Sequence, residues 1–167
     1  MRSKWRRWLR EILLMLLIAA AVIWGVDRLR KPELPASFSA VPVQTLDGER
    51  PSIAALSAER PLLIYVWATW CAICRYTTPA VEELAREGGN VLSVALRSGD
   101  DVRLAQWMAK KGLTLPVVND PRGVLAQEWQ VGVTPTLVFV FKGEVKGTTT
   151  GWSSYWGMKL RLWWAGV

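Results

Sequence analysis

Residues 66–75 read VWATWCAICR and contain the only two cysteines of the 167-residue chain, at C-x-x-C spacing. The apolar run 62–67 is typical of a buried strand, and residues 75–87 are predicted to form a helix. Cys71 is therefore expected at or just before a helix N-terminus, where unpaired N–H groups and the helix dipole favour a negative charge. Because the thiolate is the nucleophile of disulfide exchange, we interpret Cys71 as the attacking thiol and Cys74 as the resolving thiol.

A C-x-x-C pair has four chemical interpretations. Half of a zinc site would need two further good ligands, and the chain has no histidine and no third cysteine. An inert structural disulfide would close only a very short loop, which stabilises a fold little. A two-coordinate copper(I) thiolate site is chemically allowed, because soft thiolates suit that ion. The strand before the pair and the helix after it favour the fourth interpretation, a redox-active pair.

Composition limits the other classes of function. The absence of histidine excludes histidine-based triads, Cys–His nucleophiles and histidine metal sites, and the chain has no P-loop and no G-x-G-x-x-G motif. With 51% hydrophobic and 21% charged residues, a sizeable folded core is expected. Of the net charge of +7, residues 1–31 carry +6 and residues 32–167 only +1. The basic surplus belongs to the N-terminal tail, so no nucleic-acid partner is predicted.

That tail has the layout of a membrane anchor. Basic residues precede an apolar run from Ile12 to Val26, which is short for a span unless flanking arginine and tryptophan side chains reach the interfaces. The positive-inside rule places the basic end in the cytoplasm and the rest of the chain outside. We predict four segments: a cytoplasmic basic tail (1–11), a transmembrane anchor (12–27), a linker (28–39) and a folded domain (40–167).

Two other interpretations of the apolar segment stay open. Residues 19–21 are all alanine and match the A-x-A pattern of a signal-peptide cleavage site, although the apolar run continues past them. Cleavage there would export the same domain. A buried core helix is the other alternative, which the basic flank disfavours.

The folded domain alternates between strand-like and helix-like patterns, in the order β-β-α-β-α-β-α-β-β-α. Such alternation is typical of an α/β domain with a central mixed sheet. The predicted strands are residues 41–45 (an edge strand), 62–67, 91–96, 115–118, 136–141 and 145–150. The predicted helices are residues 75–87, 101 to 110 or 111, a helix that starts at 119–121, and a final helix after Ser153-Ser154.

Helical periodicity also predicts which side chains face the core. Glu82 is expected on the polar face of the helix after the cysteines. Val102 and Val124 are expected among the core-facing residues of the two helices that follow. Three apolar residues of the final helix are predicted to share one side: Trp156, Leu160 and Trp163.

With Pro79 eight positions after Cys71, the W-A-T-W-C-x-x-C segment resembles the active-site signature of thioredoxin-like proteins. Its W-A-T-W-C form is similar to the membrane-tethered, periplasmic TlpA-type branch, which includes cytochrome c maturation reductants. Residues 132–137 (GVTPTL) resemble the family's second signature, in which the proline is cis and faces the cysteine pair. The resemblance covers about residues 38–165, including a helix-strand insertion at 101–118. Within the branch, the short anchored form most resembles the suppressor-of-copper-sensitivity D group.

This resemblance implies a thioredoxin-like α/β fold, with a central mixed β-sheet flanked by helices, plus one N-terminal transmembrane helix. It also implies that Cys71 is the nucleophile and Cys74 the resolving thiol. Pro135 would shape the substrate groove, and the neighbouring Thr134 backbone would pair with an extended substrate peptide. Trp70 would wall the site. Without the resemblance, Pro135 is read as a strand-start proline and Trp70 as ordinary core packing.

Two positions depart from the family pattern. Thioredoxins often carry a buried acid six residues before the first cysteine, where this chain has Tyr65. Cytochrome c maturation reductants often carry a glutamate three residues after the second cysteine, where this chain has Thr77. Both acids help to move the proton of the resolving cysteine, so their absence counts against the cytochrome role.

Together these observations predict a thiol-disulfide oxidoreductase that is anchored in the bacterial inner membrane, with its catalytic domain in the periplasm. It would reduce disulfides of protein substrates through a mixed disulfide on Cys71 and receive electrons from an upstream membrane thiol donor. Its only redox group would be the Cys71–Cys74 disulfide, with no other cofactor and no metal. A role in copper tolerance is expected for this reductase. Two alternatives use the same cysteines: reduction of apocytochrome c, and a copper(I)-binding module.

Overall fold

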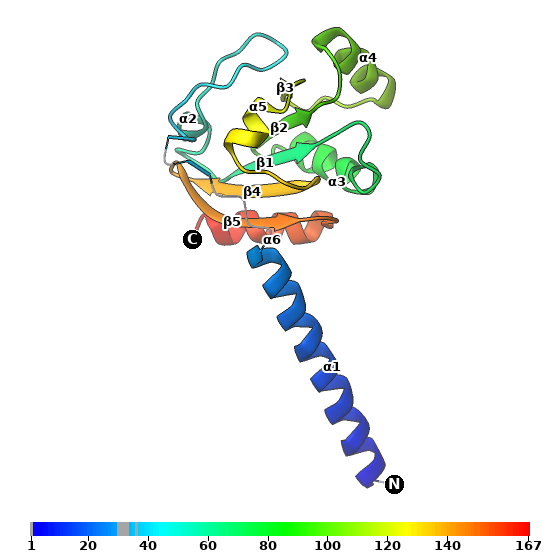
Figure 1. The fold of residues 1–167 in the computed structure, drawn as a ribbon. Coiled ribbons are helices and arrows are strands. Elements are labelled where there is room, and N and C mark those ends of the chain that lie inside the picture. The colour runs from blue at the N-terminus through cyan, green and yellow to red at the C-terminus, as the bar shows by residue number, and fades with distance from the viewer. Residues whose placement is uncertain (1, 30–33, 36) are drawn as a thin grey trace. The chain divides into compact units, whose positions relative to one another are not determined.

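The computed structural model divides the chain into two units, Met1–Lys31 and Pro32–Val167 (Figure 1). It describes residues 2–29, 34–35 and 37–167. Part of the predicted linker, residues 30–33 and 36, therefore lies outside the described residues.

The first unit is a single helix, α1 (Arg2–Leu29). Within it, Trp5–Val26 forms a 22-residue segment that is long and apolar enough to cross a membrane. At 1.5 Å per residue this segment is about 33 Å long, against about 30 Å for the hydrocarbon core of a bilayer. The helix therefore supplies the length that the apolar run alone lacks. The predicted boundaries at residues 11 and 27 stay predictions.

The second unit is built on one five-stranded mixed sheet with the order β3-β2-β1-β4-β5. Strands β1, β2 and β3 pair in parallel. Strand β4 pairs antiparallel with β1, and β5 pairs antiparallel with β4. The predicted central mixed sheet is confirmed. The strands are β1 (Leu62–Trp67), β2 (Val91–Leu96), β3 (Val117–Asp120), β4 (Thr136–Phe141) and β5 (Glu144–Thr150).

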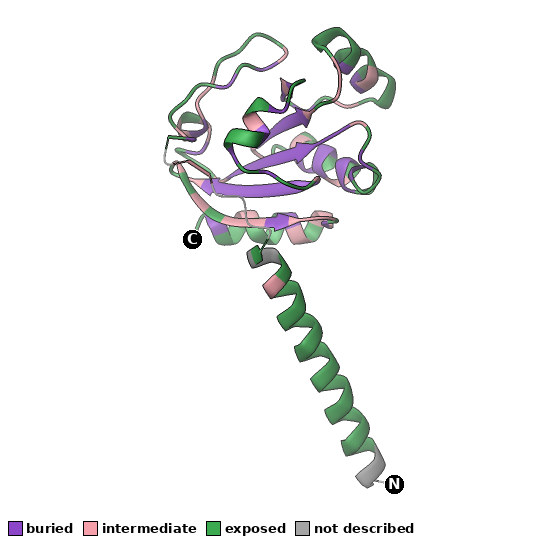
Figure 2. Ribbon diagram, viewed as in Figure 1, coloured by how far each residue is buried: buried purple, intermediate pink, exposed green. Residues whose placement is uncertain are grey.

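Helices cover both faces of this sheet, so each face has its own apolar cluster. All six residues of β1 are buried (Figure 2), which explains why that strand is apolar throughout. Alternate residues of β1 point into the two clusters: Leu63, Tyr65 and Trp67 into one, and Leu62, Ile64 and Val66 into the other. The helices are α2 (Ile53–Leu56), α3 (Cys74–Arg86), α4 (Asp101–Lys111), α5 (Val124–Glu128) and α6 (Tyr155–Ala165).

The predicted edge strand at residues 41–45 is wrong. This segment makes only two isolated bridges, between Pro42 and Ser52 and between Thr45 and Val118. Because proline has no N–H to donate, Pro42 interrupts any regular ladder at this edge. Residues 41–45 therefore run along the domain without becoming a sixth strand.

Three predicted side-chain orientations are also wrong. Val102 and Val124 are exposed. Helix α4 faces the core with Leu104 and Met108, which were also predicted, and α5 faces it with Ala126. In the opposite direction, Glu82 is buried in α3 although periodicity places it on the polar face.

The buried Glu82 carboxylate accepts hydrogen bonds from Thr114. Both of its carboxylate oxygens accept the backbone N–H of Thr114 at 3.0 Å, and the Thr114 hydroxyl donates to the same group. A charged acceptor strengthens such hydrogen bonds. Glu82 therefore ties α3 to the segment that leads into β3, which a helical pattern does not reveal.

We predict that Glu82→Ala lowers the free energy of unfolding by about 1–3 kcal/mol, because it leaves the Thr114 N–H without its acceptor. Glu83→Ala is the matched control, since Glu83 is exposed on the same helix. Denaturant titrations of both variants measure the difference. Equal changes in the two variants would contradict this role for Glu82.

Candidate active site

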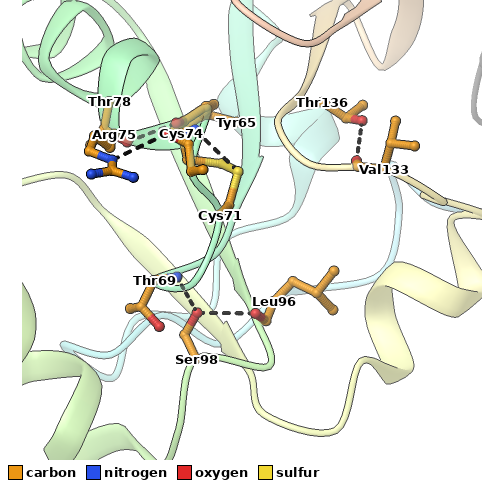
Figure 3. The surroundings of a disulfide bond; sticks show 11 residues. Tyr65, Thr69, Cys71, Cys74, Arg75, Thr78, Leu96, Ser98, Val133 and Thr136 are labelled. Carbon is orange, nitrogen blue, oxygen red and sulfur yellow. Dashed lines mark hydrogen bonds between the residues drawn. A yellow bond between two sulfur atoms is a disulfide. The ribbon is translucent and has the colours of Figure 1, made fainter.

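The two cysteines lie at the start of α3, as predicted. Cys74 is the first residue of the helix, and Cys71 lies in the turn just before it. They form a disulfide with their Cα atoms 5.3 Å apart, and the Cys74 backbone N–H donates to Cys71 Sγ over 3.1 Å (Figure 3). Cys71 is 9% exposed and Cys74 only 2%. Cys71 is therefore the more accessible of the two sulfurs, and it is the one that faces a backbone N–H donor.

The turn that carries the cysteines is held by the segment that follows β2. The Thr69 backbone N–H donates to Ser98 Oγ at 3.0 Å, and Ser98 Oγ donates to the Leu96 carbonyl (Figure 3). Trp70 Nε1 donates to the Arg97 carbonyl at 3.1 Å. These hydrogen bonds hold Thr69 and Trp70, which precede Cys71, against residues that lie nearly thirty positions further along the chain.

A second segment reaches the same end of the sheet. The Thr134–Pro135 peptide bond is cis, as the resemblance implies. Because Thr136 pairs with Val66, Pro135 lies next to the end of β1 from which the chain continues to Cys71. The Pro135 carbonyl accepts from the Gly151 N–H at 2.9 Å. Within residues 37–167, the Thr134 backbone has no hydrogen-bond partner, so it is available to a substrate peptide.

Hydroxyl groups occupy the two positions, 65 and 77, where the family resemblance leads one to expect acids. The Tyr65 hydroxyl is 2.8 Å from Thr78 Oγ1 and shares a hydrogen bond with it. Burial raises the pKa of Tyr65 above its ordinary value, so the phenol is neutral at physiological pH. Thr77 Oγ1 is buried and has no partner among the residues that the structure describes. Neither position therefore supplies a carboxylate beside the cysteine pair.

A cavity of about 390 Å³ opens beside both cysteines. Three tryptophans line it: Trp67 from β1, Trp70 from the turn before Cys71, and Trp107 from α4. The ring centroids of Trp67 and Trp107 are 5.4 Å apart. Lys111 and Arg75 also line it, and no carboxylate does. Trp67 Nε1 is buried without a hydrogen-bond partner among the described residues. The cavity therefore has room for water, or for a substrate group with an acceptor atom, next to the sulfurs.

The structure gathers all the predicted site residues around the C-terminal end of β1. Trp70 is exposed rather than part of the core, so the core-packing alternative is wrong for this residue. Pro135 directly precedes β4, so it is a strand-start proline as well as a neighbour of the cysteine turn. The substrate-binding roles of Trp70, Thr134 and Pro135 stay predictions. Among the described residues, no three side chains of His, Cys, Asp or Glu form a metal-binding group.

Sequence analysis missed three residues at the site. Trp107 and Lys111 lie more than thirty positions after the cysteines, and no local motif marks them. Trp152 is exposed. It follows Gly151, whose N–H donates a hydrogen bond to the Pro135 carbonyl. Only the sheet pairing brings it near the proline turn.

Comparisons with known proteins agree with this geometry. The AhpC/TSA family matches residues 35–149. A thioredoxin-like protein of Haemophilus influenzae is 42% identical, with 91% of this chain and 92% of that protein covered. The thiol:disulfide interchange protein DsbE of Tatumella citrea is 31% identical, with coverage of 81% and 80%.

Among solved structures, the exposed lipoprotein thioredoxin Etrx1 of Streptococcus pneumoniae superimposes with a TM-score of 0.61 at 27% identity. That similarity covers 72% of this chain and 96% of Etrx1. The likeness therefore extends over most of the chain, in sequence and in fold. The chain therefore belongs to the AhpC/TSA family of thioredoxin-like proteins and is a thiol-disulfide oxidoreductase of the DsbE and ResA type.

Proposed function

We propose that this protein is a membrane-anchored reductase of protein disulfides whose catalytic domain faces the bacterial periplasm, as in the TlpA-type branch. The hydrogen bond from the Cys74 N–H to Cys71 Sγ carries the proposal. Cys71 Sγ is the more accessible of the two sulfurs. It also faces a hydrogen-bond donor that would stabilise a thiolate there. The same cysteine pair serves as the only redox group, without another cofactor.

The reaction follows from these positions. In the reduced enzyme the Cys71 thiolate attacks a substrate disulfide, which forms a mixed disulfide and releases one substrate thiolate. Cys74, after loss of its proton, attacks Cys71 Sγ and releases the second substrate thiolate. Two electrons pass to the substrate, and the enzyme is left as the Cys71–Cys74 disulfide. A membrane thiol donor would then reduce this disulfide again, and the substrate-facing Thr134 backbone would orient the peptide.

The membrane anchor supports a periplasmic location for the folded unit. Helix α1 has the length of a membrane span, and its basic residues are concentrated before the apolar segment. The positive-inside rule then places residue 1 in the cytoplasm and the folded unit in the periplasm. An oxidising compartment suits a chain whose partners are protein disulfides. Because Thr77 replaces the glutamate of cytochrome maturation reductants, we favour a more general reductase; roles in apocytochrome reduction and in copper tolerance stay predictions.

Cysteine substitutions separate the two thiol roles. Cys71→Ser should abolish insulin reduction, because no accessible nucleophile remains. Cys74→Ser should retain attack but accumulate mixed disulfides with substrate, because the resolving step is lost. Non-reducing electrophoresis after acid quenching measures the trapped species. If both variants lose activity equally and Cys74→Ser traps nothing, the assigned roles are wrong.

The Tyr65 hydroxyl provides a pH test. Burial raises the pKa of Tyr65, so the phenol is protonated throughout the neutral range. The protonated phenol contributes to folding stability, and this contribution is lost only as pH rises past the ordinary tyrosine pKa of about 10. Tyr65→Phe should therefore leave the pH profile of Cys71 alkylation unchanged between about pH 5 and 9. It should cost about 1 kcal/mol of stability, because the Thr78 hydroxyl loses its partner. A new or missing ionisation step in that range would show that Tyr65 takes part in proton transfer.

Thiol labelling in spheroplasts tests the orientation of the full chain. After treatment with a membrane-impermeant reductant, an impermeant maleimide should label Cys71 in intact spheroplasts, and permeabilisation should add little further label. A Cys71→Ser/Cys74→Ser variant, which has no other thiol, is the control for specificity. Labelling that requires permeabilisation would place the domain in the cytoplasm and contradict the proposed compartment.

A further inference from the structure

Helix α6 has an apolar face that the domain does not cover. The large apolar residues of this face recur at i, i+4, i+7 and i+8, which puts them on one side of a helix. The residues are Trp156, Leu160, Trp163 and Trp164, here called the tryptophan stripe, and their side chains are 60–74% exposed. The opposite side of α6 packs on the domain through Met158 and Ala165, which are buried (Figure 2). Sequence periodicity predicted the shared side correctly but did not reveal that it faces outward.

The charges beside the stripe are positive. Helix α6 carries Lys159 and Arg161 and no acidic residue. Among the residues that the structure describes, one carboxylate is paired with them, that of Glu87, whose Oε2 lies 3.1 Å from Lys159 Nζ. Three tryptophans with basic neighbours form the pattern of a helix that lies in a membrane interface, where indole rings sit at headgroup level and cations meet lipid phosphates.

The covalent connection to α1 supplies the argument for a bilayer as the occupant. The candidate span ends at Val26, and Phe38 is a buried residue near the start of the folded domain. Twelve residue steps separate them, so even a fully extended chain reaches only about 40 Å. A tether of this length holds the domain within about its own diameter of the membrane surface, which makes the local concentration of lipid high.

The position of the stripe is compatible with catalysis. Gly166, directly after α6, lies against Pro61, which precedes β1. Cys71 follows the other end of β1, and a six-residue strand is about 20 Å long. Contact through the C-terminal part of α6 therefore leaves the cysteine turn in water, within reach of protein substrates.

We propose that the tryptophan stripe rests in the headgroup layer of the membrane that anchors α1, with Lys159 and Arg161 against anionic phosphates. This inference rests on the membrane anchor of the proposed function. It adds that the catalytic domain lies on the bilayer in one orientation, rather than moving freely at the end of its linker.

The test uses the full chain in nanodiscs of phosphatidylethanolamine and phosphatidylglycerol. Cys71→Ser/Cys74→Ser removes the only two thiols, so that Trp163→Cys can carry a single bimane label. Val102→Cys in the same background is the matched control, since Val102 is an exposed apolar residue on α4. Bimane quenching is measured with aqueous iodide and with lipids spin-labelled in the headgroup region, and circular dichroism checks that both variants are folded.

We expect iodide to quench the residue-163 label at least about threefold less than the residue-102 label, and the spin-labelled lipid to quench only the former. Equal access of iodide to both labels overturns the inference while the anchor stands. Shielding of the residue-163 label without quenching by lipid also overturns it, because another protein surface then covers the stripe. If the chain does not enter the discs at all, the anchor proposal fails, and this inference fails with it.

Discussion

A single backbone N–H group, that of Cys74, is the constraint around which this active site is arranged. It can point at Cys71 Sγ only because α3 begins there, where N–H groups have no partner within the helix. The strand before the turn is buried on both faces and cannot shift its register without exposing apolar side chains. The reactive sulfur is thus held by a helix start on one side and by the sheet on the other.

The rest of the site is assembled across the sheet rather than along the chain. Pairing of Thr136 with Val66 brings the cis proline to the cysteine turn, and Ser98 holds the turn from the segment after β2. Helix α4 adds Trp107, which contacts Trp67 at the cavity. The side chains around the sulfurs are indoles, hydroxyls and cations. None of the residues lining the cavity beside the sulfurs carries a carboxylate.

The same domain has two functional faces in our interpretation. One is the end of the sheet with the cysteine turn, where the Thr134 backbone would pair with a substrate peptide. The other is the outer side of α6, whose indoles and cations suit a lipid surface. Because the C-terminal end of α6 and the cysteine turn lie toward opposite ends of β1, lipid contact through that end of α6 would leave the turn open to substrates. A short tether and a lipid-facing helix together would restrict the enzyme to substrates that come near the membrane.

Sequence by itself determined the class of this protein. The spacing of Cys71 and Cys74 between an apolar run and a helical pattern predicted a redox-active pair at a helix start, and the strand-helix alternation predicted a mixed sheet, because both are local patterns of period and spacing. Tertiary structure alone decided the burial of Glu82, the loss of the predicted strand at residues 41–45, and the outward direction of the α6 indoles. Periodicity states which residues share a face, but the neighbouring elements decide whether that face meets the core, another segment or solvent.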